Sequence, residues 1–215
     1  MRLEVKICGV NTPEVACVAA AAGADYIGLV FYPPSPRAVT PAEAGAIARG
    51  LPASVRKVGL FVDAGDALIA EALAAVGLDL LQFHGSEAPA RVAAVRARFG
   101  VPVMKAIKVA GASDVAGAGA YLRVADRLLF DAKAPEDMTG ALPGGNALAF
   151  DWRLLADRSW PLPWMLSGGL DPANVAEAAR ICGAPAVDVS SGVEDRPGVK
   201  NLDKIRAFVA AAKGC

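Results

Sequence analysis

Short β-branched runs alternate along the whole chain with Ala-rich stretches of helical length. This alternation is typical of repeated strand–helix units rather than of a β-sandwich or a helix bundle. Glycines that follow the helical stretches give a rough repeat, with Gly23, Gly50, Gly77 and Gly100 lying 27, 27 and 23 residues apart. A chain of 215 residues holds eight units of about 27 residues each. We therefore expect eight strand–helix units.

Eight runs have the length and composition of strands, and several are almost wholly apolar, as strands covered on both faces are in a parallel sheet. The expected strands are Val5 to Cys8, Tyr26 to Phe31, Lys57 to Val62, Leu80 to His84, Val103 to Ile107, Leu128 to Asp131, Trp164 to Ser167 and Ala186 to Val189. Eight parallel units without a linker predict an α/β fold, a single (β/α)8 TIM barrel that occupies residues 1–215 as one domain. The alternative is a doubly wound open sheet, but no G-x-G-x-x-G motif follows the first strand.

The helices are marked by their ends. Thr40-Pro41-Ala42-Glu43 offers an N-cap hydroxyl, a proline at the first helical position and a glutamate for a capping box. Thr12-Pro13 and Asp171-Pro172 are expected to open helices in the same way. The left-handed position that ends a helix fits five glycines, which are Gly23, Gly50, Gly77, Gly100 and Gly183.

The charge pattern argues against macromolecular partners. Lys plus Arg equals Asp plus Glu at 22 each, so the basic surface that nucleic acids and membranes attract is not expected. The longest stretch without charge, Met138 to Phe150, has thirteen residues broken by glycine and proline, whereas a spanning helix needs about 20 apolar residues. The N-terminus lacks the apolar core of a signal peptide. We expect a cytoplasmic protein with a small-molecule partner.

The cysteines give no sign of a metal site or a disulfide framework. The four cysteines, Cys8, Cys17, Cys182 and Cys215, include no C-x-x-C pair, and the sequence has one histidine. Zinc sites need clusters of such ligands. We expect reduced thiols and no bound metal.

Reactive residues gather where the expected strands end. In a barrel of this kind the chemistry lies at the C-terminal ends of the strands. The candidates there are Cys8 after strand one, Gln82 and His84 at strand four, Asp131 at strand six, Gly168-Gly169 after strand seven, and Ser190-Ser191-Gly192 after strand eight.

The glycine and serine clusters after strands seven and eight indicate a phosphate site, because backbone N–H groups can approach an anion closely there. The alternative reading is that Gly168-Gly169 and Ser190-Ser191-Gly192 are ordinary tight turns. A proline-rich loop after strand two ends in Arg37, whose guanidinium can pair with a second anionic group such as a carboxylate. The expected ligand carries a phosphate.

Cys8 and Asp131 form the candidate acid–base pair. Strands one and six lie well apart around an eight-stranded ring, so the two side chains can address opposite sides of one substrate. An unperturbed thiol has a pKa of about 8.5 and an unperturbed aspartate one of about 3.9, so the site has to shift one or both. The alternatives are a buried structural thiol for Cys8, a solvated helix cap for Asp131 and a packing role for His84.

The motifs, taken in order, resemble the phosphoribosylanthranilate isomerase family of tryptophan biosynthesis. The matching segments are Lys6-Ile7-Cys8-Gly9, Ser35-Pro36-Arg37, Leu81-Gln82-Phe83-His84-Gly85, Phe150-Asp151-Trp152, Leu166-Ser167-Gly168-Gly169-Leu170, and Asp188-Val189-Ser190-Ser191-Gly192-Val193-Glu194 followed by Pro197-Gly198 and Lys200. Together they span nearly the whole chain.

The resemblance implies a catalytic domain that performs an Amadori rearrangement without a cofactor. The ribosylamine ring of N-(5-phosphoribosyl)anthranilate opens to an imine, which loses its C2′ proton to give an enolamine and then the ketose. The family's general base corresponds to Cys8, its general acid to Asp131 and its carboxylate-binding arginine to Arg37. The expected substrate-binding residues are Arg37, Gln82, His84, Gly168, Gly169, Ser190, Ser191 and Gly192. A monomer or a homodimer fits equally well.

One segment departs from the family's pattern. The loop after strand six usually carries Gly-Gly-Thr-Gly, and here it reads Gly144-Gly145-Asn146-Ala147, with Leu148 and Ala149 before the next motif. Ala147 has less backbone freedom than glycine, so we expect the loop to differ in shape.

Two other functions stay open on the residues alone. The histidine-pathway isomerase performs the same rearrangement with a pair of aspartates, which Cys8 argues against. A non-catalytic phosphosugar-binding barrel would keep the phosphate turns but would need neither Cys8 nor Asp131.

Overall fold

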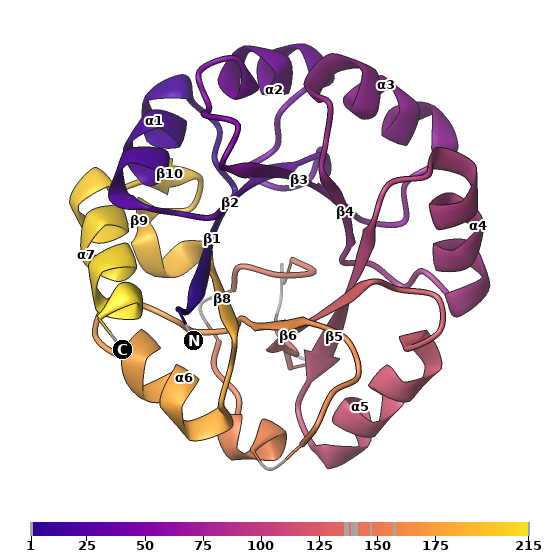
Figure 1. The fold of residues 1–215 in the computed structure, drawn as a ribbon, viewed down its shortest axis with the longest axis vertical. Helices are drawn as coiled ribbons and strands as arrows, with labels where there is room; N and C mark the ends of the chain where they lie inside the picture. Colours follow the sequence, from indigo (N-terminus) through magenta and orange to yellow (C-terminus); the bar gives the residue numbers. More distant parts are fainter. Residues whose placement is uncertain (1, 136–137, 139–141, 147, 157, 215) are drawn as a thin grey trace.

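The chain forms a closed barrel of eight parallel strands in the computed structural model, which describes residues 2–135, 138, 142–146, 148–156 and 158–214. The strands follow one another around the barrel in chain order, and β8 pairs with β1 to close it (Figure 1). They are β1 (Glu4–Cys8), β2 (Tyr26–Val30), β3 (Arg56–Phe61), β4 (Leu80–Phe83), β5 (Val103–Val109), β6 (Arg127–Ala132), β7 (Trp164–Leu166) and β8 (Ala186–Val189). The predicted TIM barrel and its eight strands are confirmed, with ends that differ by one or two residues.

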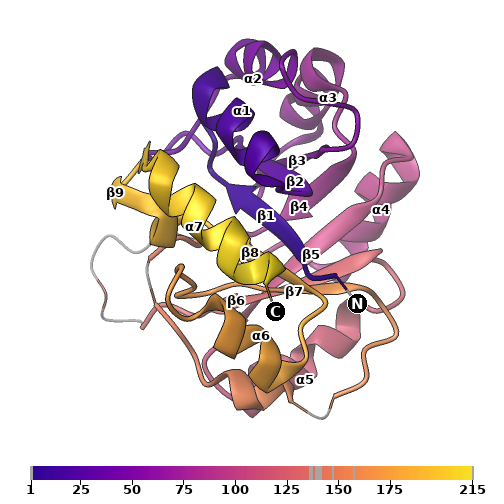
Figure 2. The same ribbon diagram turned by 60° about the vertical axis from the view of Figure 1, so that its left-hand side comes forward.

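The helices form a ring around the barrel. They are α1 (Pro13–Ala22), α2 (Pro41–Ala48), α3 (Asp66–Val76), α4 (Pro89–Phe99), α5 (Ala112–Gly117), α6 (Val175–Cys182) and α7 (Leu202–Lys213), with 3-10 helices η1 (Ala118–Tyr121), η2 (Trp152–Leu155) and η3 (Ser191–Val193). Helix α7 packs against α1 and α6 (Figure 2) and covers the junction where the barrel closes. No helix within the described part of the chain is both long and apolar enough to cross a membrane.

The sixth strand–helix unit departs from the expectation of eight complete units. Between β6 and β7 the described residues contain only the 3-10 helix η2, so the expectation of a full helix there is wrong. Prolines and glycines, including Pro135, Pro143 and Gly144, interrupt this segment, and neither residue type sustains a helix interior.

Two of the three predicted helix starts are confirmed. The Thr12 hydroxyl accepts the Val15 N–H, and Thr40 and Glu43 make both hydrogen bonds of a capping box. The third start is wrong by a few residues, because α6 begins at Val175. The Asp171 carboxylate accepts the N–H groups of the next two non-proline residues and thereby forms a turn before the helix rather than its cap.

The predicted helix-ending glycines are confirmed at four of five positions. Gly23, Gly77, Gly100 and Gly183 adopt the left-handed conformation, with φ between 63° and 104°. Gly50 does not, since α2 ends earlier and the residue after it, Arg49, stays right-handed. The chain leaves α2 through a tight turn closed by the Leu51 N–H and the Ala48 carbonyl.

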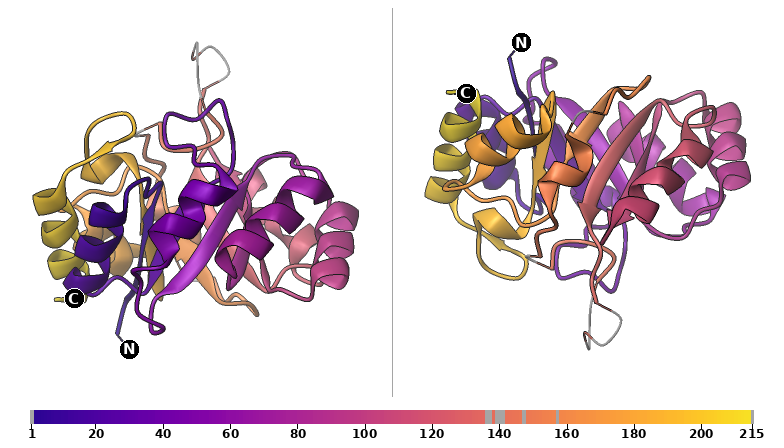
Figure 3. Two further views of the ribbon diagram at one scale, coloured as in Figure 1. Left: turned by 90° about the horizontal axis from the view of Figure 1, so that it is seen from above. Right: turned by 90° about the horizontal axis from the view of Figure 1, so that it is seen from below.

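A short antiparallel hairpin follows β8, and the sequence did not predict it. Its strands are β9 (Glu194–Arg196) and β10 (Val199–Lys200), joined through Pro197 and Gly198. The hairpin lies at the barrel end to which the strands point, and the N-terminus lies at the opposite end (Figure 3). It carries two charged side chains, Glu194 and Lys200, that are buried.

Candidate active site

A cavity opens at the C-terminal ends of the strands, and its walls enclose about 730 Å³ with the open mouth included. Eight of the ten predicted site residues line it: Cys8, Arg37, His84, Asp131, Gly168, Gly169, Ser190 and Ser191. Gln82 lies fully buried against His84, and Gly192 lies outside the lining. No group of three or more potential metal-ligating side chains occurs among the described residues. The reactive groups that the sequence predicted for one site therefore share one cavity.

Cys8 ends β1 with its side chain directed to the inside of the barrel. Its thiol is buried, with the residue 5% exposed, and burial raises the pKa of Cys8 above the ordinary thiol value. The ammonium groups of Lys6 and Lys200 act in the opposite direction and lower this pKa. Two opposing effects therefore act on the protonation of the sulfur. Desolvation favours the thiol, and the two cations favour the thiolate.

Asp131 lies near the end of β6 and is held at both of its oxygens. Oδ1 accepts the N–H of Ala132 at 2.9 Å, and Oδ2 lies 3.0 Å from Nε2 of His84. The other ring nitrogen, Nδ1, lies 2.9 Å from the Gln82 amide nitrogen. An amide N–H donates, so with this assignment Nδ1 accepts and Nε2–H donates to Asp131. His84 therefore orients the Asp131 carboxyl group.

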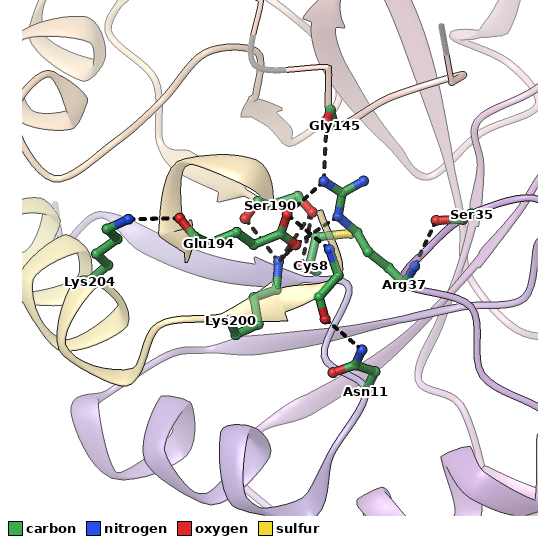
Figure 4. A network of polar contacts seen from close by, with 10 residues as sticks. Cys8, Asn11, Ser35, Arg37, Gly145, Ser190, Glu194, Lys200 and Lys204 are labelled. Carbon is green, nitrogen blue, oxygen red and sulfur yellow. Dashed lines mark hydrogen bonds and ion pairs between the residues drawn. The ribbon is translucent and has the colours of Figure 1, made fainter. Parts of the chain in front are cut away.

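Arg37 lines the cavity but is also tied to the hairpin that follows β8 (Figure 4). Its Nε and Nη2 donate to the two carboxylate oxygens of Glu194, each at 2.8 Å. Lys200 donates to the same carboxylate at 2.8 Å, and these two cations hold the pKa of Glu194 below its usual value against the effect of burial. One edge of the guanidinium is thus fixed by protein, and Nη1 has no hydrogen-bond partner among the described residues.

In the loop after β6, the described residues Leu142–Asn146 and Leu148 line the cavity. The Gly145 carbonyl accepts from Arg37 Nη2 at 3.2 Å, and a Cβ on Gly144 would lie 2.8 Å from His84 Nε2. The Asn146 amide accepts the Leu142 N–H and donates to the Leu142 carbonyl, at 3.0 and 2.7 Å. Asn146, in the place of the family's threonine, closes this turn. Ala147, the other departure from the family's pattern, lies outside the described residues.

The turns after β7 and β8 present backbone N–H groups to the cavity. Gly168 and Gly169 have φ of 86° and 66°, a conformation that side chains other than glycine's rarely permit. Within the described residues, the N–H groups of Gly168, Gly169, Ser190 and Ser191 have no protein acceptor. Unpaired N–H groups from two adjacent turns form a concave donor surface suited to an anion.

Gly192 lies outside the cavity lining, but its lack of a side chain allows the turns after β7 and β8 to come close together. A Cβ at this position would lie 1.9 Å from the Leu170 carbonyl oxygen, so the turns after β7 and β8 approach one another through it. We expect Gly192→Ala to destabilise the fold by about 1–3 kcal/mol through overpacking, measured by urea unfolding. Gly65→Ala is the matched control, since a Cβ there meets nothing within 4 Å. Equal stability of the two variants would contradict the assignment of a close approach.

Sequence reasoning missed the buried charges around the predicted residues. Glu194 and Lys200 were part of quoted motifs but received no role, and Lys6 likewise was read only as part of a motif. The pairings join residues 157 and 182 positions apart. One feature of the sequence could have predicted the Lys6–Asp188 pair. Each of these charged residues lies inside a strand, between two apolar neighbours.

Comparison with known proteins identifies relatives over the whole length of the chain. The sequence model described as N-(5'phosphoribosyl)anthranilate (PRA) isomerase matches residues 5–211. The N-(5'-phosphoribosyl)anthranilate isomerase of Paramagnetospirillum magneticum is 59% identical over 214 residues, which cover 100% of this chain and 99% of that protein.

Solved structures of phosphoribosyl anthranilate isomerases also resemble this chain in sequence and fold. The phosphoribosyl anthranilate isomerase of Thermotoga maritima is 37% identical, with a TM-score of 0.87 and coverage of 99% of this chain and 100% of that one. A further phosphoribosyl anthranilate isomerase, solved with reduced 1-(o-carboxyphenylamino)-1-deoxyribulose 5-phosphate, is 35% identical, with a TM-score of 0.83 and coverage of 99% and 100%.

Proposed function

The chain belongs to the N-(5′-phosphoribosyl)anthranilate isomerase family, and from that premise we propose that Cys8 and Asp131 are the acid–base pair of its reaction. The reaction is the Amadori rearrangement of N-(5-phosphoribosyl)anthranilate to 1-(2-carboxyphenylamino)-1-deoxyribulose 5-phosphate in tryptophan biosynthesis. It moves one hydrogen from C2′ to C1′ and opens the ribose ring, so it needs one acid and one base. The observation that carries the proposal is that the thiol of Cys8 and the carboxyl group of Asp131 line the same cavity.

Asp131 acts first in this proposal. It donates a proton to the ring oxygen while the nitrogen lone pair forms the C1′–N double bond, which breaks the C1′–O bond and leaves a protonated, positively charged imine with a free hydroxyl. The hydrogen bond from His84 Nε2 at 3.0 Å fixes the direction in which the carboxyl group points. His84 therefore serves the acid as a positioning residue, and the proton that Asp131 delivers is replaced from solvent.

Cys8 acts second, as the base. Its thiolate removes the proton from C2′, and the electron pair of that C–H bond forms the C1′–C2′ double bond of the enolamine while the imine nitrogen becomes neutral. Proton return to C1′ and loss of the C2′ hydroxyl proton give the ketose. β1 and β6 are separated by β7 and β8 around the ring, so the base and the acid reach the substrate from different sides.

The phosphate of the substrate is assigned to the turns after β7 and β8. The four N–H groups without protein acceptors, those of Gly168, Gly169, Ser190 and Ser191, are donors that a phosphate can occupy. An anchor at the 5′ end leaves C1′ and C2′ nearer the middle of the cavity. Because this anchor lies away from the reacting atoms, its binding energy holds the substrate in the orientation that the reaction needs.

Arg37 is assigned to the anthranilate carboxylate. Its Nε–Nη2 edge is held by Glu194, so the ligand meets the Nη1 side of a guanidinium that cannot rotate. A planar guanidinium positioned in advance gives up little side-chain entropy when it binds an anion.

Arg37→Lys tests this assignment with two ligands that both carry the phosphate, the reduced product analogue and its counterpart without the carboxylate. Lys keeps the charge but not the planar fork, so we expect the first ligand to lose about 1–3 kcal/mol of binding free energy and the second much less. Isothermal titration measures both. Equal losses for the two ligands would move the carboxylate site away from Arg37.

We also propose that the chain works as one catalytic domain in the cytoplasm, as a monomer or a homodimer, on a small phosphosugar and with no cofactor, nucleic acid or membrane partner. The balanced charge of the sequence supports the absence of a nucleic-acid or membrane partner. Sedimentation at several protein concentrations distinguishes the two oligomeric states.

A further inference from the structure

A pair of opposite charges lies inside the barrel directly beneath Cys8, and the proposed acid–base pair does not use it. Lys6 lies on β1 two residues before Cys8, so both side chains point to the same side of the strand. Asp188 lies opposite Lys6 on β8, and the Lys6 ammonium donates to its carboxylate at 2.8 Å. The Lys6 side chain is 0% exposed and that of Asp188 is 4% exposed.

The stability of the fold does not explain why this pair is there. Removing two charges from water costs several kcal/mol per ion, and apolar side chains of the same volume often stabilise a core at least as well. The pair is costly, and it lies beside Cys8, the one thiol among the described residues that line the cavity. A functional reason for its position therefore has to be sought at that thiol.

The Lys6 ammonium and the Cys8 sulfur lie beside the same residue of β2, Gly28, and the charge of Lys6 favours the thiolate of Cys8. Gly28, opposite Cys8 on β2, leaves the space for both groups. A Cβ on Gly28 would lie 3.0 Å from Cys8 Sγ and 3.0 Å from Lys6 Nζ. One hydrogen of the ammonium is directed to Asp188, and another can be directed to the sulfur.

Lys200 is the other cation near Cys8, but its hydrogens are committed elsewhere. Its ammonium donates to the Ser190 carbonyl, the Ser190 hydroxyl and the Glu194 carboxylate, at 2.9, 3.3 and 2.8 Å. Three acceptors use all three donors of an ammonium group. Lys6 is therefore the cation that can give a hydrogen bond to the sulfur.

We propose that Lys6 is a positioning residue for the base, and that its ammonium, held in place by Asp188, stabilises the thiolate of Cys8 by direct contact. The proposal rests on the role of Cys8 put forward above, and it adds the group that makes a buried thiol usable as a base. Asp188 in turn accepts from the Ser167 hydroxyl at 3.2 Å, which fixes the carboxylate that holds the ammonium.

The direction of the pH effect follows from the charges that face Cys8. Burial raises the pKa of Cys8, Lys6 is the strongest of the groups that lower it, Asp188 raises it and Lys200 lowers it. Four further titratable or charged groups, Tyr32, Arg37, His84 and Asp131, line the same cavity. Thiolate forms above the pKa, so activity rises with pH through it. Removing the Lys6 charge raises this pKa and moves that rise to higher pH.

Lys6→Met tests the proposal through the rate of alkylation of Cys8 by iodoacetamide as a function of pH, resolved by peptide mass spectrometry. An opposite charge in contact changes a pKa by roughly one to three units, so we expect the alkylation midpoint to rise by that amount and the acid limb of kcat/KM to move with it. Cys17, which is exposed on α1, reports in the same digest that the reagent is unchanged.

Two further variants keep the test decisive. Lys6→Met leaves the buried Asp188 without its partner, whereas Lys6→Met combined with Asp188→Asn removes both charges. The double variant should show a smaller rise, because the effect of Asp188 on Cys8 opposes that of Lys6. Lys105→Met is the matched control, since it breaks another buried pair, Lys105 with Glu87 at 2.9 Å, and should leave the Cys8 midpoint where it is.

The outcomes separate this proposal from the assignment of the base. Alkylation measures the protonation of the sulfur without turnover, so a raised midpoint supports the contact whatever the isomerase rates are. An unchanged midpoint in a folded Lys6→Met or double variant overturns it, even if Cys8→Ser is inactive. A rise of the same size in Lys105→Met also overturns it, because the effect would then not come from Lys6.

Discussion

Cys8→Ser is expected to lower kcat by about 10²–10⁴, the range that loss of a general base produces. A serine hydroxyl is nearly the size of the thiol but is far too weak an acid to supply an anion at neutral pH. The contacts of the cavity walls are otherwise retained, so the affinity for the reduced product analogue should change little. Steady-state rates and a titration with that analogue measure the two quantities separately.

Cys17→Ser is the control for this variant, because Cys17 is exposed on α1 and outside the cavity lining. It should match the parent in rate and in affinity. Turnover of Cys8→Ser within a few fold of the parent would end the assignment of Cys8 as the base.

Asp131→Asn is expected to be similarly damaging, again by about 10²–10⁴ in kcat. The amide keeps the shape of the side chain but cannot deliver the proton that allows the ring oxygen to leave. Its single oxygen can keep the hydrogen bond from the Ala132 N–H, while the hydrogen bond from His84 is lost. Neither group is assigned to hold the phosphate or the carboxylate, so binding of the reduced product analogue should survive. Single-turnover kinetics isolate the chemical step from product release.

Asp203→Asn supplies the comparison, since the Asp203 side chain is 93% exposed and pairs only with a neighbour on its own helix. It should leave the rate unchanged. If Asp131→Asn instead loses affinity for the analogue while its single-turnover rate stays normal, Asp131 is a binding residue and not the acid.

The fold was predictable because its signals are local. Apolar β-branched runs, threonine caps and helix-ending glycines each depend on a few consecutive residues, and eight repeats reinforced one another. The errors arose where local signals competed. Asp171-Pro172 could open a helix or form a turn, and the first α6 residue, Val175, shows that the turn prevailed. Between β6 and β7, prolines and glycines interrupt the helix that the repeat predicted.

That most of the candidate site residues line one cavity was predictable from the sequence, but the contacts between them were not. Cys8, Asp131 and Arg37 follow strand or loop motifs, and the rule that chemistry lies at the C-terminal ends of barrel strands brought them together. Their partners come from distant segments. That His84 orients Asp131, and that Glu194 holds Arg37, depends on which strand and hairpin lie side by side, which periodicity does not specify.

The most direct measurement is the spectroscopic consumption of N-(5-phosphoribosyl)anthranilate by the purified chain, run beside Cys8→Ser and Asp131→Asn at equal enzyme concentration. The parent should consume the substrate far faster than a blank and release the 1-deoxyribulose 5-phosphate product in equal amount. Both variants should bind the reduced product analogue and yet fall by about 10² or more in rate. A parent no faster than the blank, or variants as fast as the parent, would contradict the assignment of Cys8 and Asp131 as the base and acid of an isomerase.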